Sequence, residues 1–236
     1  GGDLSSVLIN PAGLGFYNRS ELSITPQISF RNNTTSYLDQ ENVDFNEKFS
    51  LGQIGVSIDL TKSDIQKGDF RGGSLAFTFN KRNDFNNEVQ LIGDNFQSSI
   101  VDFYLEGAQG TFTSDLYRDN NGDQVPSGPV GMAYDAFLFD IDINNCNDPS
   151  NCNLYERFYA FEPMRQREII TTKGNQNEWT ASYGGNFKDK FYFGTKLGIA
   201  TVNYTIDKAY SETALNQGVD GLQKMTLTDR LEINGA

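Results

Sequence analysis

Residues 22–31 read Leu22-Ser-Ile-Thr-Pro-Gln-Ile-Ser-Phe-Arg31, and apolar and polar residues alternate along the whole segment. Successive side chains of an extended strand point to opposite faces, so this segment has one apolar and one polar face. The same period returns over 53–60, 74–80, 178–183, 191–206 and 225–233. The sequence therefore predicts an all-β, antiparallel fold of about six strands.

The alternation changes phase within the 191–206 segment. The odd-numbered Phe191, Phe193, Leu197 and Ile199 are apolar, and beyond Val202 the even-numbered Tyr204 and Ile206 are apolar instead. An extra residue in the strand would produce such a change, and so would a new environment. The sequence predicts a β-bulge or a change of environment near Ala200.

A soluble β-sandwich and a transmembrane β-barrel both contain such strands, and three features favour the barrel. The polar faces carry small, mostly uncharged residues, as a crowded or water-filled lumen requires. Short connections at 61–70 and 186–190 alternate with long ones at 32–48, 82–174 and 207–223, like periplasmic turns and outer loops. Aromatic residues also gather near strand ends, where membrane interfaces lie: Phe30, Phe49, Phe79, Trp179, Phe191 and Phe193. We predict an antiparallel transmembrane β-barrel of the bacterial cell outer membrane.

Composition excludes several classes of protein. The chain has 236 residues, a net charge of −12 and no histidine. Its mean hydropathy is −0.50, and it has no apolar run of the roughly 18 residues that a membrane-spanning helix needs. The acidic charge argues against nucleic acid as a partner. The lack of His removes common metal and haem ligands and the usual base for Ser and Cys nucleophiles, so we expect neither an enzyme nor a resident cofactor.

The connection 82–174 is too long to lack structure of its own, and we expect a partly helical extracellular insertion. Ile100, Phe103 and Tyr104 have helical spacing, and 132–139 is a second helical candidate. Their apolar faces would form a landing groove for a hydrophobic ligand. The alternative is a purely structural cap over the barrel mouth.

Two loops of this insertion contain further candidate sites. Asp119, Asn121 and Asp123 alternate as oxygen ligands do at the start of a calcium loop. Val130 occupies the position where such a loop carries Glu, and an Asn/Asp-rich turn explains the segment equally well. Cys146 and Cys152 flank an Asn-rich loop, for which we favour a local disulfide in an oxidising compartment over two free thiols.

The first residues do not read as a strand. Ser5 to Ile9 form a short semi-apolar helical turn, and Asn10-Pro11 breaks it because the residue before Pro avoids the α region. Glycines at 13 and 15 then allow a compact bend. Such a kinked peptide would fit inside a lumen, so we divide the chain into an N-terminal plug, 1–19, and a partial barrel, 20–236. The chain opens inside this motif, and we expect it to start after processing or truncation.

Gly1-Gly2-Asp3 followed by Asn10-Pro11-Ala12-Gly13 resembles the N-terminal hatch signature of the FadL/TodX outer-membrane transport family. The resemblance implies that these residues form a hatch, with Ser5 to Leu8 as its short helix. Residues 75–87 also resemble a branch often labelled as hemin receptors, although without His no axial ligand for hemin is evident. Family members are fourteen-stranded barrels of Gram-negative bacteria. The resemblance therefore implies further strands, from missing C-terminal sequence or from other chains.

The resemblance implies a porin-like channel for passive uptake of hydrophobic small molecules, such as long-chain fatty acids or hydrocarbons, surrounded by outer-membrane lipid. Family members commonly release such ligands sideways into the membrane. An alternative function is that of some FadL-like relatives, which act as docking or shuttle components for a secretion or uptake complex. The extracellular loops would then bind a protein partner. A barrel hydrolase is disfavoured because that chemistry usually needs Ser with His.

Overall fold

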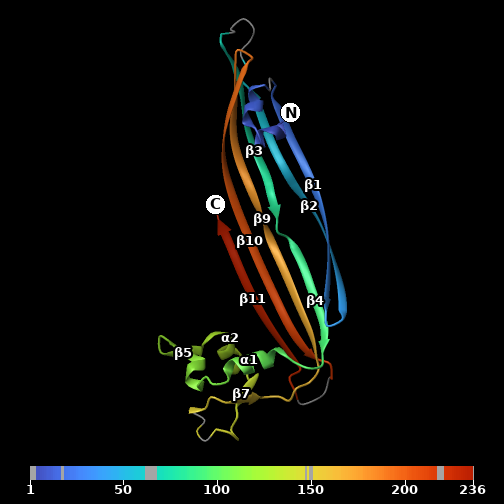
Figure 1. The fold of residues 1–236 in the computed structure, drawn as a ribbon, viewed down its shortest axis with the longest axis vertical. Helices are drawn as coiled ribbons and strands as arrows, with labels where there is room; N and C mark the ends of the chain where they lie inside the picture. Colours follow the sequence, from blue (N-terminus) through green and yellow to red (C-terminus); the bar gives the residue numbers. More distant parts are fainter. Residues whose placement is uncertain are drawn as a thin grey trace.

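The computed structural model describes residues 4–16, 19–61, 68–146, 148, 151–216 and 221–235, apart from the side chains of Ser5 and Ser6. Its main feature is one long, curved antiparallel sheet (Figure 1). The N-terminal segment lies against the sheet near one end, and a small insertion with helices lies at the other end.

Seven strands of the described chain form this sheet, in the order β1-β2-β3-β9-β10-β11, with β4 also paired to β9. β3 pairs with residues 175–187 of β9 and β4 with residues 164–172, so β9 supports two successive strands along one edge. The predicted strands are all present, and β4 is one that the alternation did not predict. The strands are β1 Glu21–Tyr37, β2 Gln40–Asp59, β3 Phe70–Asp84, β4 Asn87–Asn95, β9 Met164–Phe187, β10 Phe191–Ala214 and β11 Lys224–Gly235.

The strands run further than the alternation predicted, so the predicted long connections were wrong in their bounds. Most of 32–48 belongs to β1 and β2, which are joined by a turn at Leu38–Asp39. Residues 82–84 belong to β3 and 164–174 to β9, and β10 continues to Ala214. The φ angles at Leu38, Asp39, Lys188 and Asp189 are 48° to 60°, as two-residue hairpin turns that match the strand twist require. Strand pairing needs only backbone groups, so it continues through polar sequence where the side-chain pattern fades.

Side chains of β1 cover the edge of β4 that does not pair with β9. Arg31 donates to the carbonyls of Asn86 and Asp84 at 2.5 and 2.6 Å. Asn33 donates to the carbonyl of Glu88 at 2.8 Å, and Thr35 to that of Gln90 at 2.5 Å. These bonds satisfy backbone acceptors that an open strand edge would leave exposed.

The sheet has two chemically different faces. We call the face that carries the N-terminal segment the inner face; Ser57, Ala76, Ser182 and Lys196 stand in one row on it. The outer face carries the adjacent, alternate residues of the same strands. One outer row consists of Ile24, Ile54, Phe79, Trp179 and Ile199.

No bulge exists near Ala200, so that part of the prediction was wrong. β9 and β10 pair without a register shift from Phe191 to Ala214. The apolar residues change face instead: Ile199 lies on the outer face, whereas Tyr204 lies on the inner face and its ring contacts Phe85 at 5.2 Å. A continuous strand therefore presents apolar residues on opposite faces at its two ends.

The insertion between β4 and β9 folds around its own core. It contains α1 Ile100–Ala108, η4 Thr113–Leu116, β5 Tyr117–Asn120, β6 Asp123–Pro126, α2 Gly128–Asp135, β7 Phe139–Ile141 and β8 Tyr155–Arg157. The second helix starts and ends earlier than predicted, because Phe137 adopts a left-handed φ of 56° and Phe139 begins a strand. The buried core of the insertion is formed by Val101, Tyr104, Ala108, Leu116, Ala133, Leu138, Phe139 and Tyr155. No helix in the described chain is both long and apolar enough to cross a membrane.

A fully buried carboxylate, Glu212 of β10, joins this insertion to the sheet. It accepts hydrogen bonds from the Ser99 hydroxyl at 2.5 Å and from the Ile100 amide at 2.9 Å, at the N-terminus of α1. Gln166 and Tyr210 of the sheet donate to it at 2.7 and 2.8 Å. A helix N-terminus favours negative charge, so Glu212 stabilises both the start of α1 and its position.

We expect Glu212→Ala to loosen the insertion. Each donor left without an acceptor costs roughly 1–3 kcal/mol, so docking should weaken by at least about 3 kcal/mol. Limited proteolysis and amide hydrogen exchange across 96–163 measure this, and both should accelerate. The control is Glu232→Ala, which removes an exposed carboxylate of β11; equal effects of the two variants would contradict the anchoring role.

Candidate functional site

The N-terminal segment, residues 4–16, packs on the inner face as two short 3-10 helices, η1 Leu4–Leu8 and η2 Pro11–Gly15. Asn10 caps η2, because its side-chain oxygen accepts a hydrogen bond from the Ala12 amide at 3.1 Å. Pro11 suits the first helical position, where its missing N–H needs no partner. Leu4, Val7 and Leu14 are buried in one cluster with Ala76 of β3, so apolar contact holds the segment on the sheet.

Glycines let the backbone of η2 touch the backbone of the sheet. A Cβ atom on Gly194 would lie 2.3 Å from the Ala12 nitrogen, and one on Gly184 would lie 2.5 Å from the Pro11 oxygen. From the other side, a Cβ on Gly15 would lie 2.2 Å from the Gly185 oxygen. Because no side chain fits at these positions, the glycines form the floor on which η2 rests.

Polar contacts hold the segment at two further points. The Lys196 ammonium donates to the carbonyl of Leu8 at 2.7 Å, at the C-terminal end of η1, where a cation is favourable. The ring of Phe16 meets the ring of Tyr192 edge-on, with centroids 5.6 Å apart. The buried hydroxyls of Ser57 and Ser182, however, have no hydrogen-bond partner among the described residues. Unpaired buried polar atoms weaken an interface. The interface between the N-terminal segment and the sheet is therefore closely packed, but its hydrogen bonding is incomplete.

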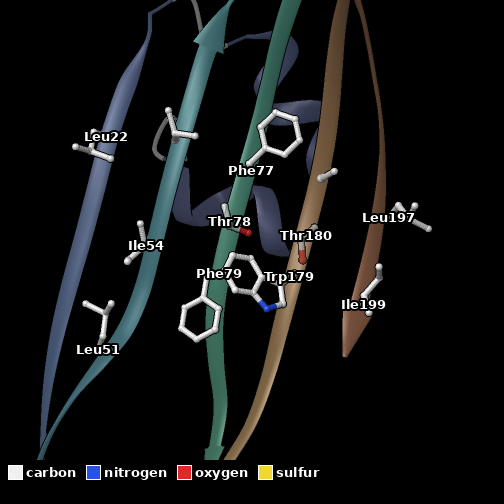
Figure 2. Close-up of a pocket in the computed structure, with 12 residues that line it drawn as sticks. Leu22, Leu51, Ile54, Phe77, Thr78, Phe79, Trp179, Thr180, Leu197 and Ile199 are labelled. Carbon is white, nitrogen blue, oxygen red and sulfur yellow. The ribbon is translucent and has the colours of Figure 1, made fainter. Parts of the chain in front are cut away.

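The outer face, opposite the N-terminal segment, is apolar and exposed (Figure 2). A second row beside the one described above consists of Leu22, Val56, Phe77, Ala181 and Leu197. Leu197 exposes 72 % of its surface. The small side chain of Ala181 lies among larger ones, within a shallow cavity of about 570 Å³. Thr78 and Thr180 also line it, from inner-face positions of β3 and β9.

The residues of the predicted hatch are only partly described. Gly1, Gly2 and Asp3 lie outside the described residues, as does the side chain of Ser5. Leu8, Asn10, Pro11, Ala12 and Gly13 belong to the docked segment, in and between the two 3-10 helices. The prediction missed Lys196 and the glycines at 184 and 194. Glycines at alternate positions of predicted strands were the available signal for a close backbone approach.

The three residues predicted to bind a hydrophobic ligand differ in their exposure. Tyr104 is buried in the core of the insertion, and Ile100 packs against that core. Phe103 is exposed, although its ring contacts Tyr104 at 5.4 Å. Burial of Tyr104 is what the alternative, a structural cap, requires.

Asp119, Asn121 and Asp123 lie in the hairpin formed by β5 and β6. Asn121 and Gly122 have positive φ angles of 58° and 96°, and the Gly122 amide donates to the Asp119 carboxylate at 3.1 Å. This is the Asn-Gly turn chemistry of a tight hairpin. Within the described residues no three His, Cys, Asp or Glu side chains cluster as metal ligands, and calcium stays a prediction.

Cys146 and Cys152 are joined by a disulfide, with their Cα atoms 5.6 Å apart. Cys152 is buried next to the core of the insertion, and its carbonyl accepts a hydrogen bond from the Thr113 amide at 3.3 Å. The link therefore closes the loop that precedes β8.

No protein-family model, no curated protein sequence and no solved structure matches this chain.

We expect Gly194→Ala to displace η2 from the sheet, because the new Cβ atom meets backbone atoms that cannot move independently. Gly198→Ala is the matched control on the same strand and face, since its Cβ atom would meet only the flexible end of Glu178. Amide hydrogen exchange of residues 4–16 should rise at least tenfold in the first variant and stay unchanged in the second. Equal protection in both variants would contradict the glycine floor.

Proposed function

We propose that this chain forms part of the wall and the plug of an outer-membrane β-barrel. The barrel would allow passive uptake of hydrophobic small molecules, such as long-chain fatty acids or hydrocarbons. One observation carries the proposal: apolar side chains cover the exposed outer face, while a folded N-terminal segment occupies the small-residue inner face. A water-soluble sheet buries its apolar face instead. A barrel in lipid exposes apolar side chains outward and keeps polar ones inside.

The change of apolar face along β10 supports the proposal. From Phe191 to Ile199 the outer positions are mainly apolar, and beyond Thr201 they include Asn203 and Asp207. The apolar part matches the roughly 9–11 residues that a tilted strand needs to cross the hydrocarbon core. Past that boundary water would surround the sheet, which accounts for polar outer positions there.

The docked segment supports a role as a movable plug. Its buried apolar side chains are few, and two hydroxyls beneath it lack hydrogen-bond partners among the described residues. Displacing it would let water pair with those hydroxyls, which offsets part of the free-energy cost of exposing Leu4, Val7 and Leu14. Transport of this kind needs no chemistry beyond binding and displacement. The resemblance of 1–13 to the FadL/TodX hatch supports the same role.

A second candidate function is docking of a protein partner for a secretion or uptake complex. The observation that favours it is a folded insertion with exposed aromatic side chains at Phe137, Phe158 and Tyr159, whose rings contact one another in sequence. Exposed aromatic residues are common anchors of protein interfaces.

Trp179, the single tryptophan of the chain, allows a direct test of the membrane-facing surface. In vesicles that contain brominated acyl chains its fluorescence should be quenched, because its ring lies on the outer face. The variant Trp179→Phe supplies the background from any other fluorophore. Unquenched fluorescence of the reconstituted protein would contradict a lipid-facing outer surface.

Charge in the outer face should oppose insertion into a bilayer. We expect Leu197→Arg to destabilise the inserted state by about 2–4 kcal/mol, as arginine does near a bilayer midplane. Thr205→Arg is the control on the same strand and face beyond the apolar part, with an expected cost of about 0–1 kcal/mol. Urea titration of the vesicle-inserted protein measures both, and equal costs would argue against a boundary between them.

Uptake of a fluorescent long-chain fatty acid into proteoliposomes tests the transport function itself. The protein should accelerate uptake over empty vesicles, and Gly194→Ala should change the rate whereas Gly198→Ala should not. Transport would be contradicted by uptake rates equal to those of empty vesicles. If a stoichiometric protein partner were also recovered from native membranes, docking would be the supported function.

A further inference from the structure

Besides the cavity on the outer face, the structure has a cavity of about 250 Å³ in the insertion, which the proposed transport does not use. It lies between β5, α2 and β7, away from the N-terminal segment (Figure 1). Its lining consists of Tyr117, Tyr134, Asp135, Phe137, Phe139 and Asp140. Cavities for drug-sized ligands span roughly 300–1,000 Å³, so this one fits a small molecule or a single head group.

Aromatic rings form most of its wall. Tyr134 is central: its ring lies 6.2 Å from that of Tyr117 and 5.7 Å from that of Phe139, centroid to centroid. Phe139 is fully buried and fixes the base, whereas Phe137 is exposed at the left-handed residue that follows α2. Ring faces attract cations through their quadrupoles, most strongly where water is excluded.

Two carboxylates add negative charge to this wall. The Tyr117 hydroxyl donates to Asp135 at 3.1 Å, and the Tyr134 hydroxyl donates to Asp140 at 3.5 Å. Burial raises the pKa of Tyr134 to about 12, and the charge of Asp140 adds to the effect, so this tyrosine stays a donor at neutral pH. Neither carboxylate forms an ion pair with a Lys or Arg of the described chain. The cavity therefore carries two carboxylates that no Lys or Arg of the described chain neutralises through an ion pair.

We propose that this cavity binds a small alkylammonium group, such as a quaternary ammonium head group. Its methyl groups would contact the rings of Tyr134 and Phe137, and its charge would be balanced by Asp135 and Asp140. A hard metal ion is a poorer match, because calcium takes six to eight oxygen ligands and aromatic carbon forms most of this wall. A neutral sugar could stack on the rings but would leave the carboxylates unbalanced. The proposal goes beyond transport and does not depend on the barrel.

Choline is the probe, and 3,3-dimethylbutan-1-ol is its neutral isostere with the same shape. Binding to the whole protein is followed by calorimetry and by the NMR shift of the choline methyl protons, which move upfield when they lie over aromatic rings. We expect choline to bind at least tenfold more tightly than the isostere. A free cation and a lipid head group share this chemistry. Binding of phosphocholine and of vesicles with choline head groups is therefore measured as well, to distinguish a soluble ligand from a lipid.

Asp135→Asn combined with Asp140→Asn should weaken choline binding at least tenfold while retaining the shape of the cavity. Glu106→Gln, at an exposed carboxylate of α1 in the same insertion, is the control and should change nothing. Phe137→Ala, at an exposed ring, should weaken binding severalfold and remove part of the upfield shift. Equal affinity for choline and its isostere, preference for methyl glucoside, or unchanged binding in the double variant would each overturn the proposal.

Discussion

Backbone pairing along β9 is the constraint on which the rest of the structure depends. This strand must satisfy hydrogen-bonding groups along both edges, and it does so with β10 on one side and with β3 and β4 in succession on the other. Because β9 and β10 keep one register throughout, the inner and outer faces of these two strands stay the same from end to end. The floor of glycines and the anchoring carboxylate Glu212 both take their positions from that register.

A continuous register makes the change of apolar face meaningful. If a bulge had separated the two halves of β10, the shift from Ile199 to Tyr204 would only follow the backbone. Since the backbone is regular there, the change of face lies in the amino-acid sequence itself. Apolar residues point outward in one half of the strand and inward in the other, which is the pattern that a boundary between lipid and water would select.

Two different means attach segments to the inner face of this sheet. The N-terminal segment is held by close backbone approach over Gly184 and Gly194, which tolerates no added atoms, and by the apolar cluster of Leu4, Val7 and Leu14 with Ala76. The insertion is held by the buried, fully hydrogen-bonded Glu212 at the start of α1. Backbone shape and apolar contact therefore dominate the attachment of the N-terminal segment, whereas a buried charge dominates that of the insertion.

The sequence by itself determined the strands, their two unlike faces and the break at Asn10-Pro11, because alternation and proline sterics are local properties. It also indicated helical structure near Ile100, where a capping box at Ser99 starts α1. Strand ends, the seventh strand and the bounds of the insertion were decided only by tertiary structure, since backbone pairing does not require apolar side chains. The same holds for the floor of glycines, the Glu212 anchor and the cavity around Tyr134. The floor and the anchor bring together residues far apart in sequence, and the cavity brings together side chains of β5, α2 and β7. Only the register of the folded sheet and the packing of the insertion decide which of them meet.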